Sequence, residues 1–197
     1  MRFATMTMPF AGALLLLGSA AVTPAQVVSL QPLVTDQDAV LEPAIVGEWD
    51  DLRITQAGDS EYEACLGEDE LCVRFRLTRL AGELFADLRF GRIGKSGGEL
   101  FPEDGLLLAM HVFARIQVEG DDLHIELMDR EWFADQVKRE QYPVHGVLKN
   151  TVVLVAPSDE VKQLVLRYAS KSEAFSSEHV YHRHEPEPAS AEKVVDK

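Results

Sequence analysis

The sequence has few positively charged residues and few cysteines, and its glycine and proline contents are ordinary. Its 197 residues include 19 Lys and Arg against 33 Asp and Glu, which gives a formal net charge of −14. A chain this acidic lacks the basic surface that binds a nucleic-acid backbone or an anionic membrane, so we expect neither partner. With 46% hydrophobic and 26% charged residues, the composition is that of a globular domain and excludes collagen or wholesale disorder.

The N-terminus has the pattern of a secretory signal peptide. Arg2 precedes an apolar run over residues 10–22, and small residues and Pro24 follow it. The run has 13 residues, fewer than the roughly 20 that a membrane-spanning helix needs, so a permanent anchor is the weaker interpretation. We predict a signal peptide over residues 1–25, cleaved after Ala25 with Ala21 as the second choice. The protein is then periplasmic or secreted and not an integral membrane protein.

Cys65 and Cys72 are the only cysteines, and export would place them where disulfides form. They flank a Gly- and acid-rich turn between two strand-like runs, so we predict a disulfide across a hairpin. Two reduced thiols near the hairpin tip are the alternative. The spacing is not C-x-x-C, and no further zinc ligands stand nearby at a suitable spacing.

Most of the remaining chain alternates between apolar and polar residues, as strands with one buried face do. Three hairpins are predicted, over residues 73–78 with 84–90, residues 111–118 with 123–127, and residues 144–148 with 151–155. A last strand is expected around residues 178–182. Residues 26–43 form a polar leading segment without a period, and residues 185–197 a flexible tail. The Gly-rich residues 91–105 are either a lid over a cavity or an ordinary solvent loop.

Two helices interrupt the strands. Asp129 is predicted to be the N-cap of a helix over residues 130–140, and Ser158 is predicted to be the N-cap of a second helix. The second helix has apolar residues at helical spacing, so its stripe should pack on the outside of the sheet. That stripe consists of Val161, Leu164, Val165 and Tyr168.

The motif Gly47-Glu48-Trp49, placed just before the first strand, resembles the G-x-W motif that opens lipocalins and related calycin barrels. The resemblance implies a Trp that packs across the closed end of an eight-stranded cup. It also implies an Arg near the end of the last strand that stacks over the Trp. Arg167 lies in the predicted helix and Arg183 lies late in the chain, so neither is assigned to that position.

A larger part of the chain, most of residues 45–182, resembles small exported bacterial lipocalin-like proteins of unknown function. This resemblance implies a fold and a cavity, and it supplies no ligand. The stretches that carry it are residues 84–88, His111-Val112-Phe113, residues 120–127, residues 128–132, Ala156-Pro157-Ser158 and Ala174-Phe175.

We therefore predict one mainly β domain over residues 44–184, an antiparallel up-and-down lipocalin-like β-barrel with two short helices. Trp49 either lines a pocket or closes one end of the barrel, and we favour the second role. No cofactor is expected. The residues predicted to face the barrel interior, as a ligand site or as a filled core, are Phe75, Leu77, Leu88, Phe90, Ile116 and Ile125.

Few residues suggest catalysis or metal binding. His179, His182 and His184 form H-x-x-H-x-H, in which two imidazoles on one strand face could hold a metal, but a polar tail is the plainer interpretation. Asp87 and His111 fall on the polar phase of their strands and should face solvent or a strand neighbour. Because no known catalytic motif occurs, we predict no enzymatic activity.

The leading hypothesis is an exported protein that binds a small apolar or amphipathic molecule in the barrel. The alternative is a structural or interaction module of the cell envelope with a filled barrel and an unknown protein partner. A cavity of several hundred Å³ would favour the first, and a filled interior the second. An enzyme is the third and weakest hypothesis, and a buried Asp–His pair at hydrogen-bond distance would reopen it.

Overall fold

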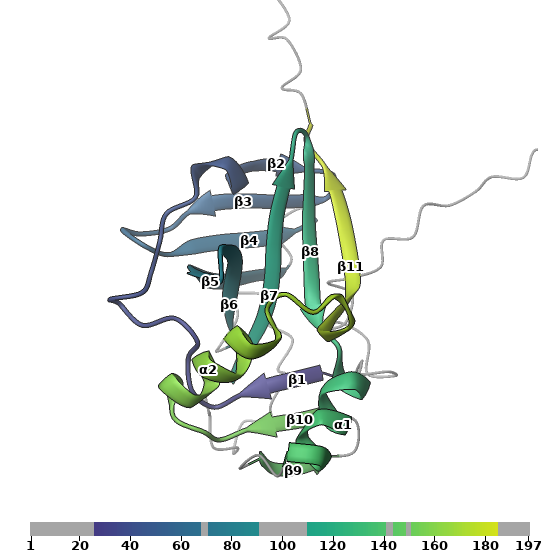
Figure 1. Cartoon of the computed structure of the whole chain (residues 1–197). Coiled ribbons are helices and arrows are strands. Elements are labelled where there is room, and N and C mark those ends of the chain that lie inside the picture. Colours follow the sequence, from purple (N-terminus) through teal and green to yellow (C-terminus); the bar gives the residue numbers. More distant parts are fainter. Residues whose placement is uncertain (1–25, 68–70, 91–109, 141–143, 149–150, 185–197) are drawn as a thin grey trace, which may run out of the picture.

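The computed structural model describes residues 26–67, 71–90, 110–140, 144–148 and 151–184 (Figure 1). This part of the chain is mainly β, with two α-helices, as predicted. The strands are β1 (Gln26–Ser29), β2 (Gly47–Trp49), β3 (Leu52–Gln56), β4 (Tyr62–Leu66), β5 (Leu71–Leu80), β6 (Glu83–Phe90), β7 (Met110–Glu119), β8 (Asp122–Met128), β9 (Val144–Leu148), β10 (Thr151–Leu154) and β11 (Phe175–His182). The helices are α1 (Arg130–Glu140) and α2 (Ser158–Tyr168), with short 3₁₀-helices η2 (Pro43–Ile45) and η3 (Ser172–Ala174).

Eight strands form an antiparallel meander in the order β2, β3, β4, β5, β6, β7, β8 and β11. The start of β7, at His111, also pairs with β1, and the sheet continues from β1 through β10 to β9. In Figure 1, β2 to β5 run across the direction of β7, β8 and β11, so the meander curls. The strands β1, β9 and β10 lie with α1 and α2 at the end of the molecule away from β2.

The sheet of the described residues is not closed into a barrel, so the predicted barrel is not confirmed. Its two ends meet at an isolated antiparallel bridge between Trp49 and Arg183. The backbone N–H of Asp50 donates to the carbonyl of His182 (2.8 Å), and that of His184 to the carbonyl of Glu48 (3.0 Å). A continuous ladder does not form here because β2 has only three residues and β11 ends at His182.

Two hydrophobic clusters lie on opposite faces of the sheet. Because side chains alternate along a strand, Leu84 and Ala86 of β6 belong to one cluster while Phe85 between them belongs to the other. The interior cluster fills the curl of the meander and includes Ile45, Trp49, Tyr62, Phe75, Leu77, Ile116 and Tyr181. The outer cluster joins the sheet to the helices and includes Phe113, Phe133, Val161, Leu164, Val165, Tyr168 and Phe175.

The predicted N-cap of α1 and the predicted buried stripe of α2 are both confirmed, whereas the predicted N-cap of α2 is not. Oδ1 of Asp129 accepts a hydrogen bond from the backbone N–H of Trp132 (2.7 Å), which is the predicted N-cap of α1. The apolar stripe of α2 is buried in the outer cluster, as expected. The predicted cap of α2 is wrong, because Ser158 is the first helical residue and Pro157 precedes it without a side-chain cap.

The leading segment, for which the sequence predicts no regular structure, contains β1. This strand pairs in parallel with β10, more than a hundred residues away, and no local pattern announces such a partner. The predicted signal peptide, the Gly-rich residues 91–105 and the tail over residues 185–197 lie outside the described residues. No helix in the described ranges is long and apolar enough to cross a membrane.

Candidate functional site

A cavity of about 60 Å³ lies inside the meander and is lined almost entirely by apolar side chains. Four of the six residues predicted to face the interior line it, namely Phe75, Leu88, Ile116 and Ile125. The other two do not reach it. Leu77 is fully buried in the interior cluster, and Phe90 packs against that cluster at the end of β6.

Two polar side chains of β11, His179 and Tyr181, complete the cavity wall. They stand opposite Ile125 and Leu123 of β8, which line the same cavity. Burial lowers the pKa of His179 below its ordinary value of 6.5. Burial, with the nearby charges of Asp51 and Asp50, raises the pKa of Tyr181 to about 12. Both groups are therefore uncharged near pH 7, and these two side chains add no charge to the cavity wall.

Sequence reasoning missed His179 as an interior residue and grouped it with His182 and His184. The alternation of β11 was the available signal, because His179 and Tyr181 share one face while Val180 between them is exposed. The alternation also separates the three histidines. His182 and His184 lie on the outward face, where Nδ1 of His182 is 2.7 Å from Oδ1 of Asp122, so the H-x-x-H-x-H pattern does not converge on one point.

At the β2 end of the meander, Trp49 is fully buried in the interior cluster. Its Nε1 donates a hydrogen bond to the carbonyl of Ile45 (2.8 Å). The guanidinium carbon of Arg183 lies over the ring, 3.9 Å from its centre, within the range of a cation–π contact. Trp49 is not among the residues that line the cavity, so it packs as part of the core.

Arg183 connects the end of β11 to η2, which precedes β2. Its Nη2 donates to the carbonyl of Ala44 (2.7 Å) and its Nη1 to the carbonyl of Val46 (3.2 Å). This approach favours glycine at position 47, since a Cβ there would lie 2.7 Å from Nη1 of Arg183 and displace the guanidinium. The φ of Gly47, +151°, is also one that residues with a side chain rarely adopt.

Asp87 and His111 form a buried pair across the neighbouring strands β6 and β7, so each faces a strand neighbour, and the alternative that they face solvent is wrong. They are 4% and 8% exposed, and Nδ1 of His111 lies 2.7 Å from Oδ1 of Asp87. The alternation placed both on the outward face correctly, but the leading segment covers that face. Oδ2 of Asp87 accepts hydrogen bonds from the backbone N–H groups of Leu33 (2.8 Å) and Val34 (3.1 Å), so the carboxylate holds the segment down.

The pair has the distance of a general acid–base dyad, but its contacts are those of a structural clamp. A hydrolytic dyad needs a nucleophile within reach of the imidazole. Among the described side chains, none with a hydroxyl or thiol is hydrogen-bonded to His111, and the ring's protein partner is Asp87.

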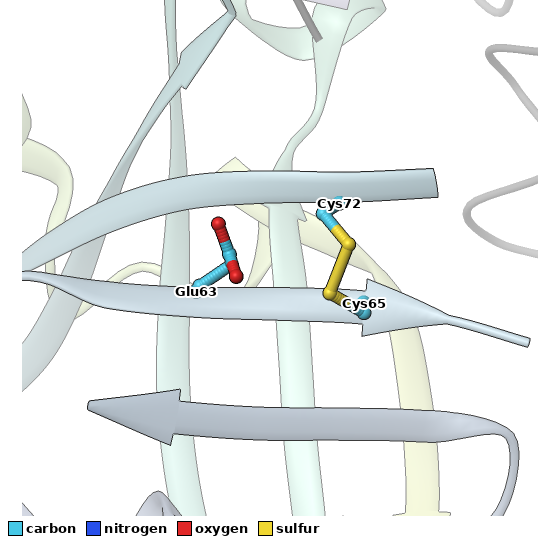
Figure 2. Close-up of side chains that lie close together, drawn as sticks. All are labelled: Glu63, Cys65 and Cys72. Atoms are coloured by element: carbon cyan, nitrogen blue, oxygen red, sulfur yellow. A yellow bond between two sulfur atoms is a disulfide. The ribbon is translucent and has the colours of Figure 1, made fainter. Parts of the chain in front are cut away.

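The predicted disulfide is present. Cys65 on β4 and Cys72 on β5 are directly paired residues, with an S–S distance of 2.10 Å. Figure 2 shows the side chain of Glu63 beside the two sulfur atoms, and the three ligand atoms lie within 4.8 Å of one another. This is not a metal site in the oxidised protein, because bonded sulfurs are not thiolates.

Comparison with known proteins supplies no relative: no family model, no curated protein and no solved structure matches this chain. The function must therefore be argued from the geometry above.

Proposed function

We propose that this chain is an exported, lipocalin-like protein that holds a small apolar or amphipathic molecule inside its β-meander. The observation that carries the proposal is the interior cavity. Its wall is apolar except for His179 and Tyr181 on one strand, which is the composition of sites that bind apolar molecules with one polar end.

The arrangement around Trp49 supports the lipocalin-like part of the proposal. The G-x-W resemblance implies an Arg that stacks over the Trp from the end of the last strand. Arg183 directly follows β11 and occupies such a position. The eight antiparallel strands of the meander agree with the strand number of that family.

The cavity volume limits the ligand. Sites for drug-sized molecules have about 300–1,000 Å³, whereas this interior leaves about 60 Å³. A guest that fits without rearrangement is therefore a very small molecule or one slender apolar chain. The same value favours the second candidate, a packed structural or interaction module, and a direct test must separate the two.

The disulfide supports the export part of the proposal, because disulfides persist in oxidising compartments. A periplasmic or secreted protein cleaved after Ala25 would begin at Gln26. N-terminal sequencing of the protein from its own host tests this, and a soluble cytoplasmic protein that still begins at Met1 would contradict it.

The ligand is tested by the mass of the protein purified from its host, measured under native and denaturing conditions without reductant. We expect a reproducible excess mass that denaturation releases. Ala114→Val adds two methyl groups to the cavity wall and should abolish the excess. Ala156→Val makes the same change beside the outer cluster and should retain it. A bare polypeptide mass for the unaltered chain would favour the packed module.

A further inference from the structure

A second and larger cavity lies on the opposite face of the sheet, between the leading segment and strands β5 to β7. Its volume is about 440 Å³, which is within the range of small-molecule sites. Its wall mixes apolar and charged side chains, whereas the wall of the interior cavity is almost entirely apolar. The titratable side chains of the larger cavity are Asp36 of the leading segment, Glu61, and Arg76, Asp87, Arg89 and His111 of the sheet.

The buried pair of Asp87 and His111 belongs to this wall. Asp87 already accepts two backbone N–H groups, and a carboxylate has no proton to give, so Nδ1 of His111 carries the proton between the two residues. In the neutral imidazole, Nε2 is then a hydrogen-bond acceptor. Among the described residues, no protein group is hydrogen-bonded to Nε2, and His111, which is 8% exposed, lines the cavity.

Two arginines stand next to the pair in the sheet. Arg76 is directly opposite Asp87 across β5 and β6, and Arg89 is directly opposite His111 across β6 and β7. Their present partners are carboxylates of the chain, with Arg76 Nη1 2.5 Å from Asp36 and Arg89 Nη2 3.3 Å from Glu61.

These ion pairs can exchange one carboxylate for another at little cost. Each pair joins a well-exposed side chain, Asp36 (89%) or Arg89 (51%), to a less exposed one, Arg76 (34%) or Glu61 (19%). Ion pairs that are open to solvent contribute little to stability. A carboxylate ligand in the cavity would keep both guanidinium groups paired, with the favourable fork geometry of Arg and carboxylate. The lining places these two arginines among three carboxylates, Asp36, Glu61 and Asp87, so an anion would bind here by replacing carboxylates of the chain.

We propose that the outer cavity binds a small hydroxycarboxylate. Its carboxylate is held by Arg76 and Arg89, and its hydroxyl donates a hydrogen bond to Nε2 of His111. An unprotonated Nε2 and a plain carboxylate are both acceptors, so a hydroxyl on the ligand supplies the donor between them. This site is independent of the interior cavity, so its success or failure leaves the proposed function untouched.

Malate and succinate test the proposal because they differ only by one hydroxyl. Titration calorimetry of the full mature chain at pH 7 should show malate binding about three- to tenfold more tightly than succinate, the value of one hydrogen bond. His111→Asn retains a donor at the position of Nδ1 and removes Nε2, so it should make the two affinities equal. Equal affinities for the unaltered chain, or binding of neither acid at millimolar concentration, would overturn the proposal.

The arginines are tested with a control on the neighbouring strand β5. Arg89→Gln should weaken both acids at least tenfold, because a charged hydrogen bond is lost. Arg79 is also 51% exposed and pairs with a carboxylate, Glu42, but it does not line the cavity. Arg79→Gln should therefore leave both affinities unchanged, and an equal loss in the two variants would refute a local site.

A spectroscopic readout on the unaltered chain keeps the test independent of variant folding. Malate should shift the Nε2 resonance of His111 in a long-range ¹H–¹⁵N spectrum, and succinate should shift it less. No shift of His111 with malate would contradict the proposed hydrogen bond even where the acid binds.

Discussion

Strands β5 to β7 carry two unlike surfaces. Their inner face packs Phe75, Ala86 and Ile116 into the interior cluster and leaves a small apolar cavity. Their outer face carries Asp87 and His111 under the leading segment. It leaves a larger cavity, whose wall mixes apolar and charged side chains. Residue alternation thus decides which way a side chain of these strands points, whereas its burial depends on a covering segment from elsewhere in the chain.

The largest expected effect concerns the inner face. Trp49→Ala should lower the free energy of unfolding by about 3–5 kcal/mol, because it removes a fully buried indole from the interior cluster. Trp132→Ala provides the comparison, since Trp132 is only partly buried, against Tyr168 of the outer cluster. Chemical denaturation measures both, and an equal or smaller loss for Trp49→Ala would contradict its role in the core.

On the outer face, Asp87→Asn should cost about 1.5–3 kcal/mol, because hydrogen bonds to a charged acceptor are lost. The backbone N–H groups of Leu33 and Val34 donate hydrogen bonds to this carboxylate. Their amide protons should then exchange faster with solvent in the variant. Asp135→Asn alters an exposed surface pair with Lys138 and should be nearly neutral. Unchanged exchange at Leu33 and Val34 would show that Asp87 does not hold the leading segment.

Gly47→Ala should cost about 1–3 kcal/mol, the range for a strained backbone conformation. The new Cβ meets Nη1 of Arg183 at 2.7 Å, so the loss should be smaller when Arg183→Ala is also present. A double-mutant cycle of unfolding free energies measures this coupling. Strictly additive losses would mean that Gly47 and Arg183 act separately.

The smallest effects come from two histidines on opposite faces of β11. The pKa of His182 is raised by its hydrogen bond to Asp122, and that of His179 is lowered by burial. The contribution of His182 to the free energy of unfolding is thus complete below pH 6.5, the pKa of histidine in the unfolded chain, and is lost as pH rises through the raised pKa of the folded state. The contribution of His179 is complete above pH 6.5 and declines as pH falls through the lowered pKa of the folded state. Titration by NMR should show His182 protonating at higher pH than His179, and the reverse order would contradict the assignment of faces.

Much of the fold follows from local sequence patterns. Strict alternation of polar and apolar residues identified β5 to β8, and the helical spacing of Val161, Leu164 and Val165 identified the buried side of α2. The Cys65–Cys72 disulfide followed from its place at a hairpin. Each of these features is specified by residues that are neighbours in sequence or across one turn.

The missing features depend on distant partners. The strand β1 was overlooked because its pairing with β10 leaves no period in a four-residue segment. The burial of Asp87 was missed because Leu33 and Val34 cover it from more than fifty residues away. Arg183 was not assigned to Trp49 because the contact depends on how the two ends of the meander meet.

The central claim is that the inner face encloses a cavity that accepts an apolar guest, and xenon tests it most directly. Dry apolar cavities bind xenon. In a methyl-labelled sample under xenon pressure, we predict saturable shifts for Leu88, Ile116 and Ile125, which line the cavity. We predict no such shifts for Val161, Leu164 and Val165 in the outer cluster. No shift in either set, or equal shifts in both, would contradict an apolar site inside the meander.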